Sequence, residues 1–294
     1  MEELMIPNTF EYHAPTSVAD ALSLLGQYGE EAKIIAGGHS LLPMMKLRFA
    51  EPAHLIDING IDELRGVREQ DGKICIGAMT TESQLISSQL LWDKCPLIPE
   101  ATKWIADPQV RNRGTIGGDI AHGDPGNDHP AIMLALGASF VLVGPNGERT
   151  VPADGFFLGT YYTQLEEGEI MTEIQVPVPA PGSGHGFSKL KRKTGDFATA
   201  AAAVQLQLDG DTCTQIIIAL TNVGPCSFKA NDAAAYLSGQ VIDESMINEA
   251  AVKAMADCDP SEDLRGNVEY KTSMAGEMVR RAIRQAVSNA KGNK

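Results

Sequence analysis

The sequence predicts an α+β protein built from three parts. Residues 1–60 carry the pattern of a small β-α-β-β unit, and residues 61–178 carry two hairpin signals among short helices. Residues 187–294 show three strands followed by three helices. That order is typical of an α+β domain in which helices cover one face of a three-stranded antiparallel sheet. The Pro-, Gly- and Ser-rich run at 177–186 is the expected linker before the third part.

The first part begins with an amphipathic helix. Thr16 or Ser17 is the expected N-cap, and Gly29 follows the end of the helix. Apolar residues recur at helical spacing, at Val18, Ala21, Leu22 and Leu25. The other expected elements are strands at 33–36 and 54–58 and a helical turn at 43–48.

The second part contains two hairpins and several short helices. Asp71-Gly72 and Pro145-Asn146-Gly147 are the turn signals. The expected strands are 66–69, 73–78, 140–143, 150–152 and 170–176. The expected helices are 82–87, capped by Thr80-Thr81-Glu82, a run at 88–105 broken at Pro96 and Pro99, and 130–136.

The third part has the strands first and the helices after them. The expected strands are 187–191, 200–208 and 214–221, and the expected helices are 230–237, 244–256 and 268–290. The last two strands meet around Asp209-Gly210-Asp211.

Charge and cysteine usage exclude several classes of protein. The net charge of −14 argues against general nucleic-acid binding and against an anionic membrane surface. No apolar run approaches the roughly 20 residues that span a bilayer, and the acidic N-terminus does not have the pattern of a signal peptide. The five cysteines are scattered without a CxxC pair, which argues against disulfides and against a zinc or iron–sulfur site and fits a reducing cytoplasm.

The run Ile35–Pro43 (IAGGHSLLP) is the first of two glycine-rich segments. Without a β-carbon, Gly37-Gly38 lets backbone N–H groups approach an oxyanion closely. We interpret the N–H groups from Gly37 to Ser40 and the Ser40 hydroxyl as a cradle for a pyrophosphate. The motif is neither a Rossmann fingerprint nor a P-loop, and an ordinary turn after a strand is the alternative.

The run Arg111–Ala131 (RNRGTIGGDIAHGDPGNDHPA) is the second. It has almost no large apolar side chain, so we expect a concave loop of exposed N–H groups. Gly114 to Asp119 supplies the second cradle, with the Thr115 hydroxyl beside it. We therefore expect two glycine loops to close around one dinucleotide, the alternative being a tight connection between core elements.

Four polar residues follow at Asp124, Asn127, Asp128 and His129. They could accept hydrogen bonds from ribose and ring edges, or ligate a metal, although their spacing matches neither an EF-hand nor a zincin. Asn127 or Asp128 could instead cap the helix that begins at Pro130.

A basic group and two rings complete the candidate residues. Lys189, Lys191 and Lys193 share one face of a strand and could offset cofactor charge, dock a partner subunit or face solvent. Phe197 could stack on a flat ring or lie in a core. His39 could be a loop histidine or a site of covalent flavin attachment.

Three segments together resemble a known family. AGGHSLLPMMKLR, VRNRGTIGGDIAHGDPGNDHPA and KLKRKTGDFATAAAAV are similar to the FAD-binding medium subunits of aerobic carbon monoxide dehydrogenases, within the molybdenum hydroxylase (xanthine dehydrogenase) family. The resemblance implies a vanillyl-alcohol-oxidase-type (PCMH-type) FAD-binding fold. Its two subdomains would be residues 1–60 and 61–178, followed by a C-terminal α+β flavoprotein domain at 187–294.

The resemblance also implies cofactors and partners. FAD would bind to this chain without a covalent link, which makes His39 a contact. A large subunit would carry the molybdopterin cofactor and a small subunit two [2Fe–2S] clusters, in a dimer of heterotrimers. Electrons would reach the flavin here and leave to a quinone, oxygen or NAD. The complex would be cytoplasmic, either free or at the inner face of the membrane.

The family motif maps onto residues of this sequence that would contact FAD. Those expected at the pyrophosphate are Lys33, Ile35, Ala36, Gly37, Gly38, His39, Ser40, Leu41, Gly114, Thr115, Ile116, Gly117, Gly118 and Asp119. Those expected to line the rest of the cofactor are Ala78, Val110, Ala121, Asp124, Asn127 and Asp128, with Ile170, Met171, Lys189 and Phe197 near the ring. Phe197 stands where such subunits usually carry Tyr, which keeps ring shielding and removes a hydroxyl.

Three functions remain open on the sequence. The first is the electron-transfer subunit of a carbon monoxide dehydrogenase, or of a related hydroxylase of aldehydes or N-heteroaromatics. The second is a stand-alone flavin oxidoreductase, and the third a nucleotide-binding assembly module without activity. The chain itself offers no catalytic triad and no iron–sulfur ligands.

Overall fold

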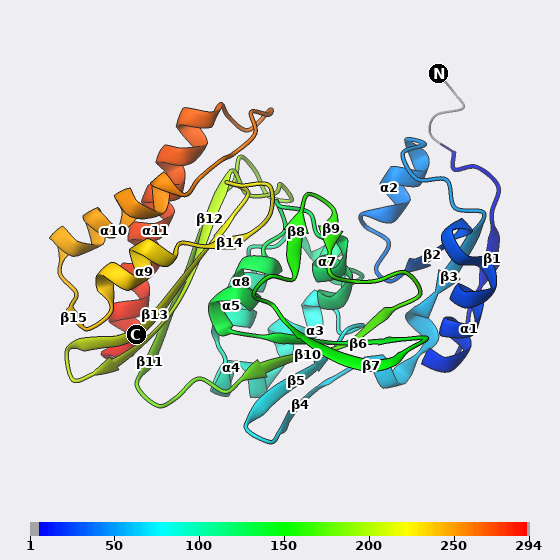
Figure 1. Cartoon of the computed structure of the whole chain (residues 1–294), viewed down its shortest axis with the longest axis horizontal. Helices are drawn as coiled ribbons and strands as arrows, with labels where there is room; N and C mark the ends of the chain where they lie inside the picture. Colours follow the sequence, from blue (N-terminus) through cyan, green and yellow to red (C-terminus); the bar gives the residue numbers. More distant parts are fainter. Residues whose placement is uncertain (1–5, 293–294) are drawn as a thin grey trace.

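The computed structural model describes residues 6–292 and contains three main sheets (Figure 1). The first sheet has the order β1-β3-β2 and is parallel, with β1 at Glu11–His13, β2 at Ala32–Ile35 and β3 at His54–Asp57. Helix α1 (Val18–Tyr28) begins at the predicted cap, where the Ser17 side chain accepts from the Asp20 N–H at 3.1 Å. The β-α-β-β order expected for this part is confirmed, although the sequence did not locate its first strand, β1. Its three residues are too few to show an alternating pattern.

Short helical segments complete the first part. Helix α2 is at Leu41–Lys46, close to the predicted turn, and 3-10 turns lie at Gly29–Glu31, Ile58–Gly60 and Asp62–Leu64.

The second sheet is antiparallel with the order β4-β5-β10-β6-β7. Its strands are Val67–Gln70, Lys73–Gly77, Ile170–Pro177, Ser139–Gly144 and Gly147–Pro152, in that spatial order. Both predicted hairpins are confirmed, and Asp71 and Gly72 have φ of 50° and 73°, as a tight two-residue turn requires.

Six short helices accompany this sheet. They are α3 (Glu82–Ser87), α4 (Gln89–Lys94), α5 (Leu97–Thr102), α6 (Pro108–Arg111), α7 (Ile116–His122) and α8 (His129–Leu136). The predicted break in the helical run falls at Cys95-Pro96, whereas Pro99 is accommodated inside α5. A small hairpin of β8 (Phe157–Gly159) and β9 (Tyr162–Thr163) was not predicted.

The third sheet consists mainly of β11 (Ser183–Leu190), β12 (Ala200–Asp209) and β13 (Thr212–Thr221), all antiparallel. The prediction of three strands is corrected to five. The short strands β14 (Phe228–Lys229) and β15 (Gln240–Val241) also pair with β13. Two-residue strands leave no periodic signal in a sequence.

Three helices follow on one face of this sheet. They are α9 (Asn231–Leu237), α10 (Glu244–Ala256) and α11 (Val268–Ala290), and the predicted bounds of α10 and α11 are confirmed.

The linker predicted at 177–186 is shorter than expected, because β11 already begins at Ser183. A β-carbon on Gly184 or Gly186 would lie 2.0 or 2.1 Å from a carbonyl oxygen of α11. These glycines are therefore strand residues that let the long helix approach the sheet.

Helix α8 joins the second and third layers. All eight of its residues are buried, between β10 of the second sheet and β12 and β13 of the third. Strand β12 is buried on both faces, since Ala201 and Ala203 belong to the core around α8 while Ala200 and Ala202 pack toward α10 and α11. This explains the unbroken apolar run in β12.

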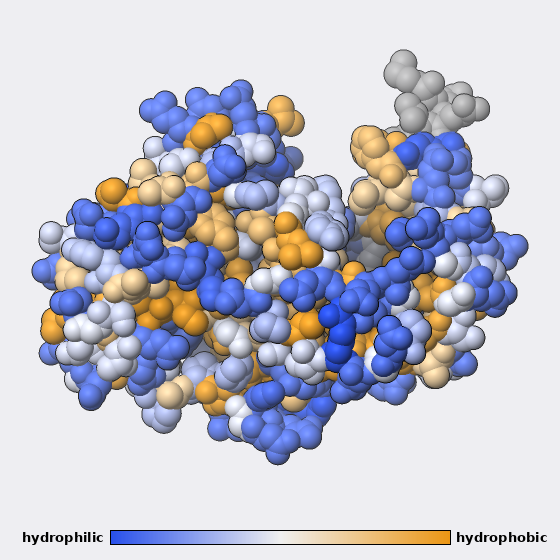
Figure 2. All heavy atoms as spheres, in the orientation of Figure 1, coloured by the Kyte–Doolittle hydropathy of each residue, from blue (hydrophilic) through white to orange (hydrophobic). Residues whose placement is uncertain are grey.

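The face of the molecule shown in Figure 2 mixes hydrophilic and apolar areas, and one apolar group lies over α2. Leu42, Leu47 and Phe49 are exposed there. Figure 2 shows a notch between these side chains and those over β8 and β9. Within residues 6–292, no helix is both long and apolar enough to cross a bilayer. All five cysteines are free thiols.

Candidate functional site

The two glycine-rich segments lie against each other. A β-carbon on Gly37 would be 2.5 Å from the carbonyl oxygen of Arg113 and 2.8 Å from the Cα atom of Gly114. A β-carbon on Gly118 would be 3.4 Å from that of Ala36. The predicted convergence is thus present in the structure, and it depends on glycine at the closest point.

The first segment presents unused hydrogen-bond donors. Among residues 6–292, no protein acceptor pairs with the backbone N–H groups of Gly37, Gly38, His39 or Ser40. The Ser40 hydroxyl does not cap α2. Gly38 has φ of 81°, a conformation that turns the chain sharply between β2 and α2. A row of such donors suits an anion.

Residues 116–122 of the second segment form the helix α7 rather than part of the expected loop. Thr115 caps α7, and its hydroxyl accepts from the Gly118 N–H at 3.3 Å. The N–H groups of Ile116 and Gly117 donate to carbonyls of the β5–α3 connection at 3.1 and 2.9 Å. These donors are therefore used within the protein. Composition favoured a loop here, but the cap and the close packing stabilise a short helix.

Hydrogen bonds from the Asn59 side chain fix the first glycine-rich segment in place. Its side-chain amide donates to the Ala36 carbonyl at 2.6 Å and to the Asp57 carboxylate at 2.8 Å. Burial pushes the pKa of Asp57 upward, but hydrogen bonds from Tyr12 and Asn59 outweigh this and lower it. The carboxylate stays ionised and holds Asn59 in place.

The predicted polar group around Asp124 lies beside α7. The Asn127 amide donates to the Asp119 carbonyl at 2.8 Å, and the Asp124 carboxylate accepts from the Gly126 N–H at 2.8 Å. Asp128 occupies the N-cap position of α8 without capping it. The capping interpretation is therefore wrong, because the Asp128 carboxylate pairs with Lys189.

A cluster of buried charges lies behind this group. His129 Nε2 is 2.7 Å from Glu82 Oε2, and both side chains are almost fully buried. Burial lowers the pKa of His129, but Glu82 outweighs this and raises it to about 9. Burial raises the pKa of Asp119 to about 8, since Glu82, Asp128 and Asp124 add like charge while His129 opposes them. His129 is thus a charged partner of Glu82.

The predicted basic face of β11 divides into two environments. Lys189 is buried and also donates to the Trp104 carbonyl at 3.4 Å, and Lys191 donates to the same oxygen at 2.8 Å. The prediction that the three lysines share one face of a strand is wrong, because β11 ends at Leu190 and both Lys191 and Lys193 follow it; Lys193 is exposed. The solvent-facing interpretation is therefore wrong for Lys189.

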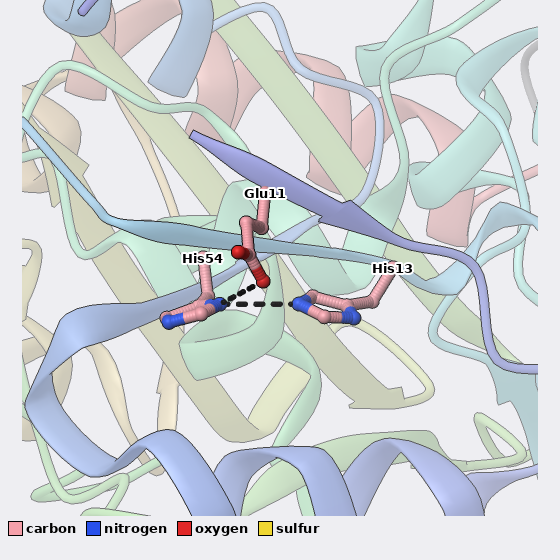
Figure 3. A group of neighbouring side chains, drawn as sticks. All are labelled: Glu11, His13 and His54. Atoms are coloured by element: carbon pink, nitrogen blue, oxygen red, sulfur yellow. Dashed lines mark hydrogen bonds and ion pairs between the residues drawn. The ribbon is translucent and has the colours of Figure 1, made fainter. Parts of the chain in front are cut away.

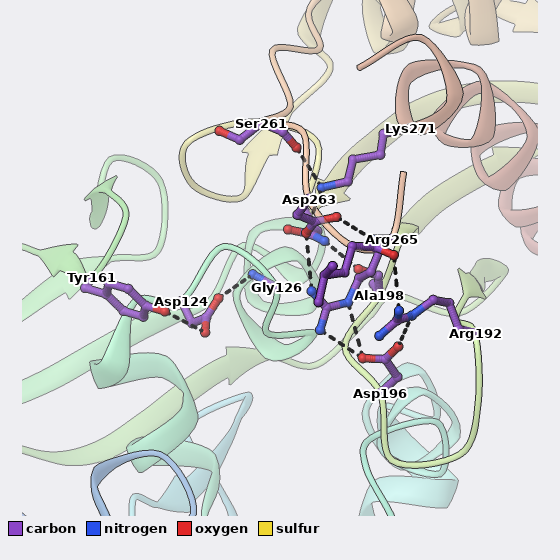
Figure 4. Close-up of polar contacts among 12 residues, drawn as sticks. Asp124, Gly126, Tyr161, Arg192, Asp196, Ala198, Ser261, Asp263, Arg265 and Lys271 are labelled. Carbon is purple, nitrogen blue, oxygen red and sulfur yellow. Dashed lines mark hydrogen bonds and ion pairs between the residues drawn. The ribbon is translucent and has the colours of Figure 1, made fainter. Parts of the chain in front are cut away.

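Phe197 lies next to Gly126 and is 43% exposed. The Arg265 guanidinium is 5.6 Å from the centre of its ring. Arg265 and Arg192 both pair with Asp196, and Tyr161 reaches Asp124 from the other side (Figure 4). Ion pairs with Arg192 of the same loop and with Arg265 of the loop before α11 therefore hold the segment that carries Phe197.

The remaining predicted residues fall into two groups. Ala78 contacts Gly117, and Val110 accepts from the Gly114 N–H at 2.7 Å. His39 is exposed, with its ring 3.2 Å from the Gly37 carbonyl. Residues around these contacts that are partly or fully buried are Ile35, Leu41, Ile116 and Ala121.

Three predicted residues are not brought to the glycine segments by a direct contact. Lys33 is exposed on β2, and Ile170 and Met171 are buried in two different cores at the start of β10.

The sequence analysis missed several residues around the site. Tyr161, Glu82, Trp104 and Arg265 each contact a predicted residue from a distant part of the chain. No local motif marks them. Only Glu82 stood in a recognised pattern, and there as part of a helix cap.

Comparison with known proteins identifies the two halves of the chain. Residues 8–179 match the FAD binding domain in molybdopterin dehydrogenase, and residues 185–286 match the CO dehydrogenase flavoprotein C-terminal domain.

Named relatives are similar over nearly the whole length. The carbon monoxide dehydrogenase medium chain of Hydrogenophaga pseudoflava is 61% identical over 96% of this chain and 98% of its own. That of Afipia carboxidovorans strain OM5 is 49% identical over 98% and 100%.

A solved structure shows the same fold. It is carbon monoxide dehydrogenase from Hydrogenophaga pseudoflava lacking the Mo-pyranopterin moiety of the molybdenum cofactor. It superimposes with a TM-score of 0.95 at 62% identity, covering 96% of this chain and 98% of the other. The chain therefore belongs to the family of FAD-binding medium subunits of carbon monoxide dehydrogenases, within the molybdenum hydroxylases.

Proposed function

We propose that this chain holds the FAD of a molybdenum-containing carbon monoxide dehydrogenase and passes electrons through it. The observation that carries the proposal is the segment Gly37–Ser40, whose N–H groups have no acceptor among the described residues and lie against the second glycine segment. A diphosphate supplies the acceptors that this row of donors requires. The FAD-binding domain of the family spans this region.

The residues at hand fit a flavin dinucleotide. Gly37 to Ser40 would bind the diphosphate, with the Ser40 hydroxyl as a further donor. Gly114, Gly117 and Gly118 would admit the cofactor through their small size and through the packing of α7, since the N–H groups of Ile116, Gly117 and Gly118 are already used. The other residues that the sequence analysis predicted to contact FAD are also proposed contacts.

The polar residues would orient the rest of the cofactor. Asp124 and Asn127 offer oxygens beside α7, and the Lys189–Asp128 pair provides a buried charge pair close to them. Phe197 would cover a flat ring, since Arg265 and Asp196 hold its segment. When bound, FAD supplies an electron relay between the iron–sulfur clusters of a partner and an external acceptor; the protein supplies binding, orientation and electrostatics.

The chemistry requires partner subunits. We infer a large subunit with the molybdopterin cofactor and a small subunit with two [2Fe–2S] clusters, in a dimer of heterotrimers. The relatives are named as medium chains of carbon monoxide dehydrogenase, which supports such an assembly. We place the complex in the cytoplasm or at the inner face of the membrane, and its acceptor is a quinone, oxygen or NAD.

A reconstitution experiment tests the proposal. The purified chain is titrated with FAD and then mixed with its partner subunits under CO without oxygen. We expect stoichiometric FAD binding by the chain alone and bleaching of the flavin absorbance by CO only in the complex.

Each other outcome contradicts a named part of the proposal. Reduction of the flavin by alcohols or amines in the isolated chain would support a stand-alone oxidoreductase. Failure to bind FAD at saturation would support an assembly module. A complex that oxidises aldehydes or N-heteroaromatics but not CO would change the substrate and keep the role of this chain.

A further inference from the structure

A group of two histidines and one glutamate lies in the first sheet, remote in sequence from the glycine segments (Figure 3). Glu11 and His13 are two residues apart on β1, so their side chains share one face of the strand. His54 opens the neighbouring strand β3, and the parallel register places it opposite Glu11. The topology of the sheet therefore brings the three side chains together.

Two of the three distances between their polar atoms are close to those between metal ligands. His13 Nε2 is 3.1 Å from His54 Nδ1, which is 3.6 Å from Glu11 Oε2, and all three atoms lie within 4.8 Å of one another. In a tetrahedral zinc site with bonds of about 2.0–2.1 Å, neighbouring ligand atoms are about 3.3 Å apart. Figure 3 shows one nitrogen of each imidazole ring and the Glu11 carboxylate turned toward one another.

The surroundings hold the ligands and leave an entry path. The Tyr28 ring stacks on His54 with centroids 3.6 Å apart and an angle of 13°, which fixes the plane of that imidazole. The Glu11 side chain is 73% exposed, so its carboxylate can adjust to an ion. An open depression of about 440 Å³ lies beside His13 and is lined by Pro15, Thr16 and Asp20 among others.

We propose that Glu11, His13 and His54 bind one divalent transition-metal ion, with Zn²⁺ as the best match and water as a fourth ligand. Imidazole nitrogens with a carboxylate suit zinc, and the hard ions Ca²⁺ and Mg²⁺ prefer oxygen alone. The site joins the short strand β1 to β3 across the sheet. It is separate from the proposed flavin site and needs no cysteine.

Metal binding to the full chain tests this proposal. The chain is stripped with a chelator, dialysed and titrated with ZnCl₂ by calorimetry, and metal content is measured after gel filtration. We expect one equivalent of Zn²⁺. Loss of outer-shell partners already weakens metal sites by about 10–100-fold, so His54→Gln or His13→Gln should weaken binding by at least about tenfold.

Two further variants keep the test independent of folding. Glu11→Gln alters an exposed side chain and should also weaken Zn²⁺ binding, whereas His39→Asn removes an imidazole outside the group and should leave it unchanged. FAD binding should be the same in the Glu11, His13 and His54 variants and the wild type, which confirms a folded chain. A wild type that takes up no stoichiometric Zn²⁺ would overturn the proposal, and so would a Glu11→Gln, His13→Gln or His54→Gln variant with wild-type affinity. The histidines would then be only a hydrogen-bonded pair stacked on Tyr28.

Discussion

Gly37 is the residue at which the two glycine-rich segments come closest. Even a methyl group there would meet the backbone of Arg113 and Gly114 at 2.5–2.8 Å, a contact that no rotamer change relieves. The segments would have to separate, and the N–H groups of Gly38 to Ser40, which have no acceptor within residues 6–292, would move with them.

We expect Gly37→Ala to weaken FAD binding by about 5- to 150-fold, because overpacking of this kind costs about 1–3 kcal/mol. Flavin fluorescence titration of the purified chain measures the change. Gly26→Ala in α1 is the matched control, since a β-carbon there meets nothing within 4 Å. Equal affinity of the two variants would show that the cofactor does not rest on the Gly37 segment.

The Glu82–His129 pair is a second residue-scale feature with a measurable effect. Both side chains are buried, and removal of one member of such a pair leaves the other without compensation. We expect Glu82→Gln to reduce the free energy of unfolding at pH 7 by about 3 kcal/mol. Glu100→Gln, which removes the more exposed partner of His185, should cost about 1 kcal/mol or less in the same urea titration. Similar losses would mean that burial does not strengthen the first pair.

The same cluster predicts a pH dependence. The folded pKa of about 9 for His129 lies above its ordinary 6.5, so its contribution is complete below pH 6.5 and is lost as the pH rises through 9. The folded pKa of about 8 for Asp119 also exceeds its ordinary 3.8, and its contribution is lost as the pH rises through 8. We expect these two groups together to lower the free energy of unfolding from about pH 3.8 to 9, most steeply between pH 6.5 and 8, where both contribute. Asp119→Asn should flatten part of this decline, and an unchanged slope would contradict the assignment to Asp119.

At the scale of single elements, α11 and β11 show why small residues are needed between a helix and a sheet. Gly184 and Gly186 lie under the carbonyl groups of α11 with no room for a methyl group. We expect Gly186→Ala to displace the helix and to lower the free energy of unfolding by about 1–3 kcal/mol. Gly159→Ala in β8 is the control, since the space around Gly159 is open. Urea unfolding measures both variants, and a neutral Gly186→Ala would mean that α11 can move away without loss.

The elements also show which features a sequence can predict. Helices such as α1, α10 and α11 have caps and apolar periodicity within a single segment, so their bounds follow from local rules. The helix α7 was expected to be a loop, because glycine composition outweighed the Thr115 cap. The strands β1, β14 and β15 form only because a partner strand is present.

The candidate site shows the same contrast between features set by one segment and features that need a distant part of the chain. The glycine segments are visible in the sequence because their chemistry is local. The pairings Asp128–Lys189 and Glu82–His129 join residues far apart in the chain, and only the fold shows them.

For the whole molecule, α8 makes the two matched halves depend on each other. Its buried side chains share one core with Phe187, Ala201 and Ala219 of the third sheet. The three-part division at 1–60, 61–178 and 187–294 remains a prediction.

We expect residues 1–180 expressed alone to aggregate or to bind an apolar dye, because one face of α8 would be exposed. Co-expression with residues 181–294 should restore a soluble complex of the two fragments, measured by gel filtration. A soluble, monomeric fragment 1–180 with full FAD affinity would show that the third sheet is dispensable for folding of the flavin site.

The N–H groups of Gly37 to Ser40, which have no acceptor in the described part of the chain, have a practical consequence for preparing the protein. Any small polyanion of the right size can occupy them, so inorganic pyrophosphate and ADP should compete with the flavin while it is being loaded. Preparations made in phosphate-rich buffers should then have low flavin absorbance even when the polypeptide is intact. Exchange into a chloride buffer before reconstitution should restore full occupancy of the site by FAD.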